Sequence, residues 1–107
     1  MLRSLFVSLL VVFSSFSPDS SFAATPRTIV FIGDSITDGY GVKKEEAYPT
    51  KVGEMLKSKG FDVKVINGGT SGSVTAEADR RVRWFLRAKP EIVVLALGGN
   101  DGLKGTP

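Results

Sequence analysis

Three short apolar runs, separated by two longer amphipathic segments, constrain the fold of this chain more than any other feature. The runs occupy residues 29–32, 61–66 and 92–97. The first and third are nearly continuous and rich in β-branched residues, as expected of strands that are buried on both faces. The second alternates at first between apolar and charged residues, a pattern typical of a strand at the edge of a sheet. We therefore expect three strands.

Each segment between two runs has the spacing of an amphipathic helix. The apolar stripe of the first helix comprises Tyr48, Val52, Met55 and Leu56. The stripe of the second comprises Ala78, Val82, Phe85 and Leu86. Pro49 suits the first turn of the first helix, and Gly60 suits its end. We interpret Tyr48, Met55 and Phe85 as core residues rather than as contacts to a cofactor.

The resulting order is β-α-β-α-β, which implies a parallel sheet with right-handed crossover connections. A spatial strand order of 2-1-3 fits best, because it places the alternating second strand at an edge. We therefore expect a three-layer α/β/α architecture of the flavodoxin-like kind. This order also leaves one edge of the apolar strand at 92–97 without a neighbour, which invites further pairing.

Ligands bind to such sheets beyond the carboxyl ends of the strands, where the strand order reverses. Polar, glycine-rich segments follow the three strands there, at residues 33–35, 67–72 and 98–101. We expect these segments to meet on one rim of the sheet. This convergence is the strongest indication of a functional site that the residues alone provide.

The residues on this rim have the chemistry needed for acyl transfer. Ser35 lies just beyond a buried strand, where a serine is exposed yet rigidly held, and its own N–H faces the same space. The N–H of Gly72 and the side-chain amide of Asn100 are two further donors for the negative oxygen of a tetrahedral intermediate. We interpret Asp34 and Asp101 as braces that hold their loops by hydrogen bonds.

Each of these features also has an ordinary structural explanation. Ser35 is of a residue type that often caps helices and turns, and Asn100 suits a turn. The loop at 67–72 is similar to the glycine-rich turns that bind anions, but it lacks the spacing and the lysine of a phosphate-binding loop. Taken singly, these alternatives stay open.

Three stretches together resemble the first three sequence blocks of the GDSL/SGNH hydrolases: FIGDSITDGYG, NGGTSG and LALGGNDG. The similarity covers residues 28–103 and is greatest to the secreted bacterial branch of thioesterase I/lysophospholipase L1 and the arylesterases. It implies an SGNH-type fold in which Ser35 is the nucleophile and shares an oxyanion hole with Gly72 and Asn100. It also implies hydrolysis of small-molecule carboxylic or fatty-acyl esters or thioesters, with no metal and no cofactor.

One block of the family is missing from the sequence. Family members carry Asp-x-x-His near their C-terminus, and this sequence contains no histidine. Because a serine nucleophile needs a base at neutral pH, we expect residues 25–107 to be the N-terminal part of an SGNH hydrolase domain, inactive and not stably folded alone. The alternative is a non-catalytic secreted α/β module that binds a small anion or nucleotide at the carboxyl ends of the strands.

Residues 1–24 have the order of a secretory signal peptide. A basic start precedes an apolar centre, and small residues follow, with cleavage expected after Ala23 or Ala24. The apolar centre is too short to span a bilayer, which takes about 20 residues. We therefore expect a periplasmic or secreted protein without a stable membrane anchor, and an uncleaved anchor is the alternative. The sequence has no cysteine, so the fold relies on its core rather than on disulfides.

The net charge of +3 is mild, although five basic residues lie close together. They are Arg80, Arg81, Arg83, Arg87 and Lys89. Acidic residues lie four positions before two of them, a spacing that favours ion pairs on the surface of a helix. We interpret this cluster as a solvated helix face and expect no nucleic-acid binding. The sequence leaves the oligomeric state open.

Overall fold

The computed structural model describes residues 25–105, so the expected signal peptide lies outside the described residues. At the centre is a parallel three-stranded sheet in the order β2-β1-β3. The strands are β1 (Arg27–Gly33), β2 (Val63–Gly69) and β3 (Ile92–Ala96). Ile29 of β1 lies opposite Val65 on one side and Ile92 on the other. The predicted parallel sheet and strand order are therefore confirmed.

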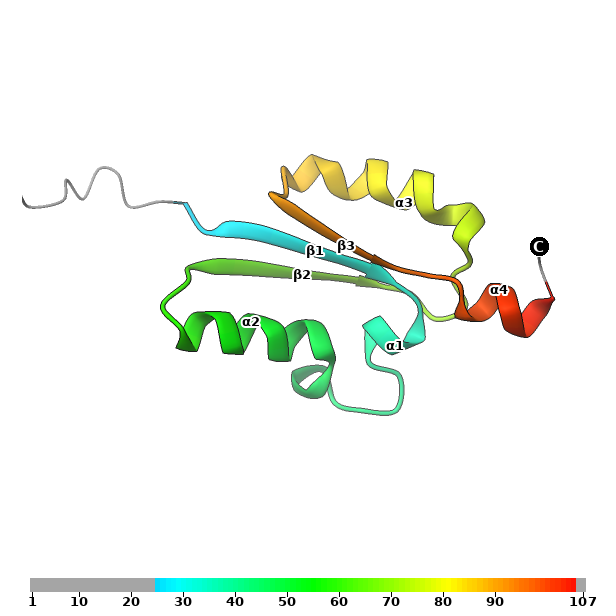
Figure 1. The fold of residues 1–107 in the computed structure, drawn as a ribbon, viewed down its shortest axis with the longest axis horizontal. Helices are drawn as coiled ribbons and strands as arrows, with labels where there is room; N and C mark the ends of the chain where they lie inside the picture. Colours follow the sequence, from blue (N-terminus) through cyan, green and yellow to red (C-terminus); the bar gives the residue numbers. More distant parts are fainter. Residues whose placement is uncertain (1–24, 106–107) are drawn as a thin grey trace, which may run out of the picture.

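Helices cover both faces of this sheet. Figure 1 shows α2 on one face and α3 on the other, with α1 and α4 near the carboxyl ends of the strands. The α-helices are α1 (Ser35–Asp38), α2 (Tyr48–Ser58), α3 (Ala78–Phe85) and α4 (Gly99–Lys104). Short 3-10 turns are η2 (Lys44–Glu46), η3 (Thr75–Glu77) and η4 (Leu86–Ala88). Within residues 25–105, none of the helices has the length and apolar character needed to cross a membrane.

A hydrophobic cluster of the core lies between the sheet and α2. Its buried residues are Ile29, Phe31 and Val63, and those of α2 that pack against them are Tyr48, Val52 and Leu56. The rings of Phe31 and Tyr48 meet edge to face with their centroids 5.6 Å apart, a favourable aromatic geometry. Tyr48 is therefore part of the core, as predicted.

Close contact between α2 and β2 depends on a glycine. A Cβ atom at Gly53 would lie 2.8 Å from Cγ2 of Val65, so a larger residue would push the helix away. Because α2 faces the sheet through Pro49 and Gly53, which are both buried, Met55 lies at the margin of the contact. Its side chain is 60% exposed, and the prediction of Met55 as a core residue is wrong.

The strands β1 and β3 are similarly apolar but differ in how far they are buried. Residues 29–32 of β1 are all buried, whereas Ile92 and Leu95 of β3 are about half exposed. The unpaired edge expected for the third strand is present, since β3 pairs only with β1 among the described residues. The expectation that β3 is buried on both faces is wrong for residues 25–105, because β3 is an edge strand there.

The second strand ends later than its apolar run. Residues 67–69 continue β2 and pair with the end of β1, so that Gly69 lies opposite Gly33. Only residues 70–72 of the predicted loop lie beyond the strand. Phe85 of α3 packs on this part of β2, because a Cβ atom at Gly68 would lie 2.6 Å from its Cζ atom. Phe85 is half-buried, in accord with its predicted place in the core.

Candidate active site

Ser35 lies at the point where β1 becomes α1. The chain leaves the buried strand at Gly33, and Ser35 is the first residue of the short helix. Ser35 is half-buried. The residue that caps this helix is Asp34, whose Oδ1 accepts a hydrogen bond from the N–H of Ile36 at 2.9 Å. The capping role considered for Ser35 therefore belongs to its neighbour. Since the first N–H groups of a helix have no partner within it, the N–H of Ser35 is available as a donor.

The helix α1 rests on the end of the sheet through polar contacts around Thr37, which is buried. Thr37 is 1% exposed, and its Oγ1 lies 2.8 Å from the hydroxyl of Tyr48. The amide of Asn67 donates to the carbonyl oxygen of Thr37 at 2.8 Å, and its own oxygen accepts the N–H of Gly69 at 2.9 Å. These bonds link α1 to both α2 and β2, so the position of Ser35 is determined by the core beneath it.

Glycines at the strand ends make this close approach of α1 to the sheet possible. A Cβ atom at Gly69 would lie 2.7 Å from Cα of Asp38, and one at Gly33 would lie 2.6 Å from Cβ of Thr37. Contacts this short are not tolerated by real side chains. Glycine at both positions is therefore needed for α1 to fold against β1 and β2.

The segments after β2 and β3 are joined to each other by side-chain hydrogen bonds. Asp101 accepts both the N–H of Thr75, at 2.9 Å, and its hydroxyl, at 2.7 Å. The amide of Asn100 donates to the carbonyl oxygen of Ser73 at 2.9 Å, and Lys104 donates to that of Gly72 at 3.1 Å. Three residues of α4 therefore hold the Gly72 loop in place through four hydrogen bonds.

The segment after β1 touches both of the others. The N–H of Thr70 donates to the carbonyl oxygen of Gly33 at 3.0 Å, which joins the first segment to the second. A Cβ atom at Gly99 would lie 3.6 Å from Oδ2 of Asp34, so the third segment lies beside the cap of α1. The predicted meeting of the three segments on one rim is therefore present, with α1 and α4 marking it in Figure 1.

The predicted oxyanion donors have the following environments. Gly72 is exposed and has a left-handed backbone with φ of 82°, a conformation that favours glycine. Asn100 is half-buried at the start of α4 and uses one amide hydrogen in its bond to Ser73. A primary amide carries two hydrogens, so a second remains available to a ligand.

Sequence comparison decides the family. A model of the GDSL-like lipase/acylhydrolase family matches residues 31–107, which is most of the chain and includes all three segments of the rim. The chain belongs to this family. The resemblance inferred from its three sequence blocks is thereby confirmed.

Relatives of this GDSL-like chain include bacterial proteins named as esterases. It is 35% identical to an arylesterase from Vibrio mimicus over 89 residues, covering 82% of this chain and 44% of that protein. It is 35% identical to esterase TesA from Pseudomonas aeruginosa, covering 77% and 41% respectively. It is 33% identical to thioesterase 1/protease 1/lysophospholipase L1 from Escherichia coli K12, covering 78% and 39%. The chain therefore spans less than half the length of these relatives.

Solved structures of the family have the same fold. The crystal structure of AlinE4, an SGNH-hydrolase family esterase, matches with a TM-score of 0.71 and 41% identity, covering 78% of this chain and 46% of that one. The structure of TesA matches with a TM-score of 0.72 and 34% identity, covering 76% and 46%. The three-layer α/β/α fold is thus that of SGNH hydrolases.

Two carboxyl groups at the rim of this GDSL-like chain accept hydrogen bonds that favour their ionised form. The two donors of Thr75 hold the pKa of the Asp101 carboxyl below its ordinary value of 3.8. The N–H of Val74, which donates to Oε2 of Glu77 at 3.2 Å, likewise lowers the pKa of the Glu77 carboxyl. Both carboxylates are therefore ionised acceptors at neutral pH, which suits a bracing role. Within residues 25–105, no group of three or more His, Cys, Asp or Glu residues is arranged to hold a metal ion.

Sequence reasoning missed several residues that build this rim. Thr75 and Lys104 contact the opposite segment across separations of 26 and 32 positions, and Asn67 reaches Thr37 across 30. No local pattern reports such pairs. Asn67 lies within the predicted rim segment 67–72, but its bond to Thr37 has no signal in the local sequence.

Proposed function

We propose that the protein hydrolyses carboxylic esters, with Ser35 as nucleophile and with the N–H of Ser35, the N–H of Gly72 and the amide of Asn100 as oxyanion donors. The observation that carries the proposal is the mutual attachment of the three segments at the carboxyl edge of the sheet. Each segment contributes one of these groups, and the family membership of the chain supports their roles.

The chemistry follows from this arrangement. The Ser35 oxygen bonds to the acyl carbon while a base takes its proton, and the carbonyl oxygen becomes negative. The three donors stabilise that charge, which is greater in the transition state than in the ester. The intermediate then releases the alcohol or thiol, which takes up the proton. Water attacks the acyl-enzyme in the same way and restores Ser35 with release of the carboxylic acid.

The base is not among these residues. The 107-residue sequence contains no histidine, and Asp101 is an ionised acceptor held by Thr75. We propose that the base is a histidine supplied from outside residues 1–107, oriented by an aspartate as in the Asp-x-x-His block of the family. Accordingly, we expect the 107-residue chain alone to be inactive.

Substrates of the fatty-acyl class fit this proposal. The relatives are named as an arylesterase, an esterase and a thioesterase with lysophospholipase activity. We propose aryl esters, fatty-acyl esters and acyl thioesters as the substrate class, without a metal or a cofactor. We further propose that the protein acts in the periplasm or outside the cell, because residues 1–24 have the order of a signal peptide.

Replacing the nucleophile tests the proposal in the intact natural protein. With p-nitrophenyl butyrate as substrate, Ser35→Ala is expected to lower kcat by about 10⁴-fold or more. Ser58→Ala is the matched control, because Ser58 lies at the exposed end of α2 and bonds only to a helical carbonyl at 2.7 Å. Activity that survives Ser35→Ala would contradict the proposal, and no hydrolysis by the intact protein would favour the non-catalytic binding module.

A further inference from the structure

A second surface with distinct chemistry lies on α3, and its cavity reaches the rim at Thr70. A cavity of about 710 Å³ opens between this helix and the end of β2. The residues that line it and matter here are Thr70, Arg80, Arg81, Arg83, Trp84 and Arg87. Asp79 is the one acidic residue of this lining, against four arginines, and a tryptophan lies among them.

The positive charge of the chain is concentrated here. Residues 78–89 contain five basic residues and one acidic residue, a net charge of +4, whereas the whole chain carries +3. The remaining residues are therefore slightly acidic in sum. A surface with this concentration attracts anions over a distance of about a Debye length, some 8–10 Å at physiological salt.

Most of these arginines are free to exchange their present partners. Arg80 and Arg83 form ion pairs with Glu77 and Asp79 at 3.5 and 3.0 Å, but these side chains are largely exposed, and exposed pairs contribute little. Arg81 donates to the carbonyl oxygen of Gly68. Its Nε is buried without a hydrogen-bond partner among the described residues, beside the cavity.

Trp84 gives the same surface an apolar anchor. It is the only tryptophan in the 107-residue sequence and is 59% exposed. The guanidinium of Arg87 lies over its ring at 4.5 Å from the centroid. The spacing of Arg80, Trp84 and Arg87 along α3 and η4 places them on one side of the helix. A tryptophan flanked by arginines is the combination found where proteins contact the headgroup layer of a membrane.

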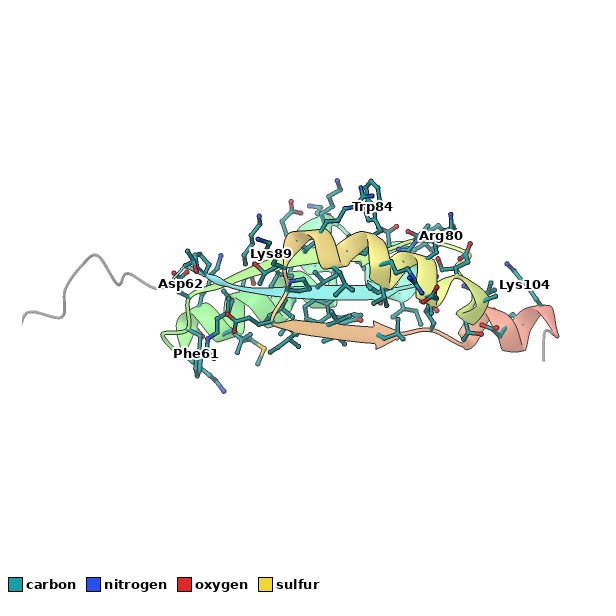
Figure 2. All side chains as sticks on the ribbon, turned by 90° about the horizontal axis from the view of Figure 1, so that it is seen from above. Phe61, Asp62, Arg80, Trp84, Lys89 and Lys104 are labelled. Carbon is teal, nitrogen blue, oxygen red and sulfur yellow. The ribbon has the colours of Figure 1, made fainter. Side chains whose placement is uncertain are left out.

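This side of α3 lies away from the unpaired edge of the sheet. Figure 2 shows Trp84 and Arg80 on the side of the helix opposite to β3. The unpaired sheet edge belongs to β3, so strands added there would extend the sheet away from this surface. We propose that the α3 surface formed by Arg80, Arg83, Trp84 and Arg87 binds the phosphodiester headgroups of an anionic membrane, with Trp84 entering the interface.

Vesicle binding by the intact natural protein tests this proposal. We expect it to cosediment with vesicles of phosphatidylcholine mixed with phosphatidylglycerol, but not with phosphatidylcholine alone, and to be released by high salt. The fluorescence emission assigned to Trp84, by difference from Trp84→Phe, is expected to shift to shorter wavelength on binding. Equal binding to both kinds of vesicle, or binding to neither, would overturn the proposal.

Two double variants separate a defined surface from net charge. Arg80→Gln with Arg87→Gln is expected to weaken vesicle binding by about 25-fold, since each basic residue near an anionic surface contributes about fivefold. The control, Lys57→Gln with Lys59→Gln, removes the same charge from exposed positions near the end of α2, on the opposite face of the sheet. This double variant is expected to change vesicle binding by less than about twofold.

Two results in this comparison would refute a lipid-specific surface. Equal losses in the two double variants would show that only overall charge matters. Binding to an oligonucleotide without binding to the anionic vesicles would assign the surface to another polyanion. Thermal unfolding of each variant controls for folding, and the salt dependence of the unmodified protein tests the electrostatic part without any substitution.

Discussion

The two sides of the candidate site are held in different ways. On the nucleophile side, α1 is attached through Thr37, which is buried, to Tyr48 of the core and to Asn67 of β2. On the oxyanion side, the Gly72 loop is attached to α4 through exposed bonds from Thr75 and Lys104. Disturbing the first side should therefore reduce stability and activity together, whereas disturbing the second should reduce activity more than stability.

The largest effect is expected at Gly69. In Gly69→Ala the new Cβ atom would lie 2.7 Å from the backbone of α1, so the helix must move or the strand must distort. We expect a loss of at least about 3 kcal/mol in the free energy of unfolding, measured by urea denaturation of the intact protein. Gly102→Ala is the control, because a Cβ there would meet nothing within 4 Å and alanine favours a helix. Equal stability of both variants would show that α1 does not rest on β2 as described.

After Ser35→Ala, Asn100→Ala is expected to have the largest effect on activity that leaves the fold in place. Removing one oxyanion donor lowers kcat by about 10²–10³-fold, with a small change in KM. The bond from Asn100 to Ser73 is lost as well, and the resulting loss in the free energy of unfolding is measured separately by urea denaturation. A kcat within about threefold of the unmodified protein would exclude Asn100 from the oxyanion hole.

Thr37→Val tests the buried attachment of the nucleophile side. The substitution preserves shape but removes the hydroxyl that lies 2.8 Å from Tyr48, leaving the tyrosine hydroxyl without this partner. We expect a loss of about 1–3 kcal/mol in stability, together with lower activity. Tyr48→Phe should cost a similar amount, and the double variant should cost less than the sum, because both remove one interaction. Additive costs would show that the two hydroxyls are not coupled.

Asp101→Asn tests the exposed attachment of the oxyanion side. The variant weakens the bonds to both donors of Thr75, so Gly72 and Asn100 lose their fixed separation. We expect kcat to fall by about tenfold with KM nearly unchanged, because a small misplacement of catalytic groups lowers the rate of the chemical step. Asp62→Asn, an exposed carboxylate ahead of β2, is the matched control. A change in KM alone would contradict a positioning role.

The acid dependence of Asp101 has a definite sign. Its pKa is lowered in the folded protein from 3.8 by the donors of Thr75, so its ionised form favours the folded state. The stabilisation is present above pH 3.8 and is lost as the pH falls through the lowered pKa. The stability difference between the unmodified protein and Asp101→Asn is therefore expected to shrink in acid. A difference that grows as the pH falls would contradict this assignment.

Local patterns in the sequence were sufficient for the architecture. The alternating apolar runs and amphipathic segments predict the strand order and helix α2, because period and burial are local properties of the chain. The GDS, TSG and GGND stretches indicate Ser35, Gly72 and Asn100 as site candidates for the same reason. The strand β2 runs three residues beyond its apolar run, since Asn67 and two glycines can also pair in a sheet.

Two aspects of the structure could not be read in this way. The environment of Met55 and of β3 depends on which elements cover them, and apolar character alone does not specify that. The pairs Thr75–Asp101 and Asn67–Thr37 join residues 26 and 30 positions apart, so they exist only once the sheet has brought the segments together. Sequence therefore indicates candidate residues for the chemistry, and the fold determines how they are held.

The most direct test of the account is covalent labelling of the intact natural protein with a fluorophosphonate. After trypsin digestion, Ser35 lies in the peptide of residues 28–43, in which it is the only serine. We predict a single phosphonyl adduct on this peptide, located at Ser35 by fragmentation and absent from Ser35→Ala. An adduct on another residue, or none on a protein that hydrolyses p-nitrophenyl butyrate, would contradict Ser35 as the nucleophile.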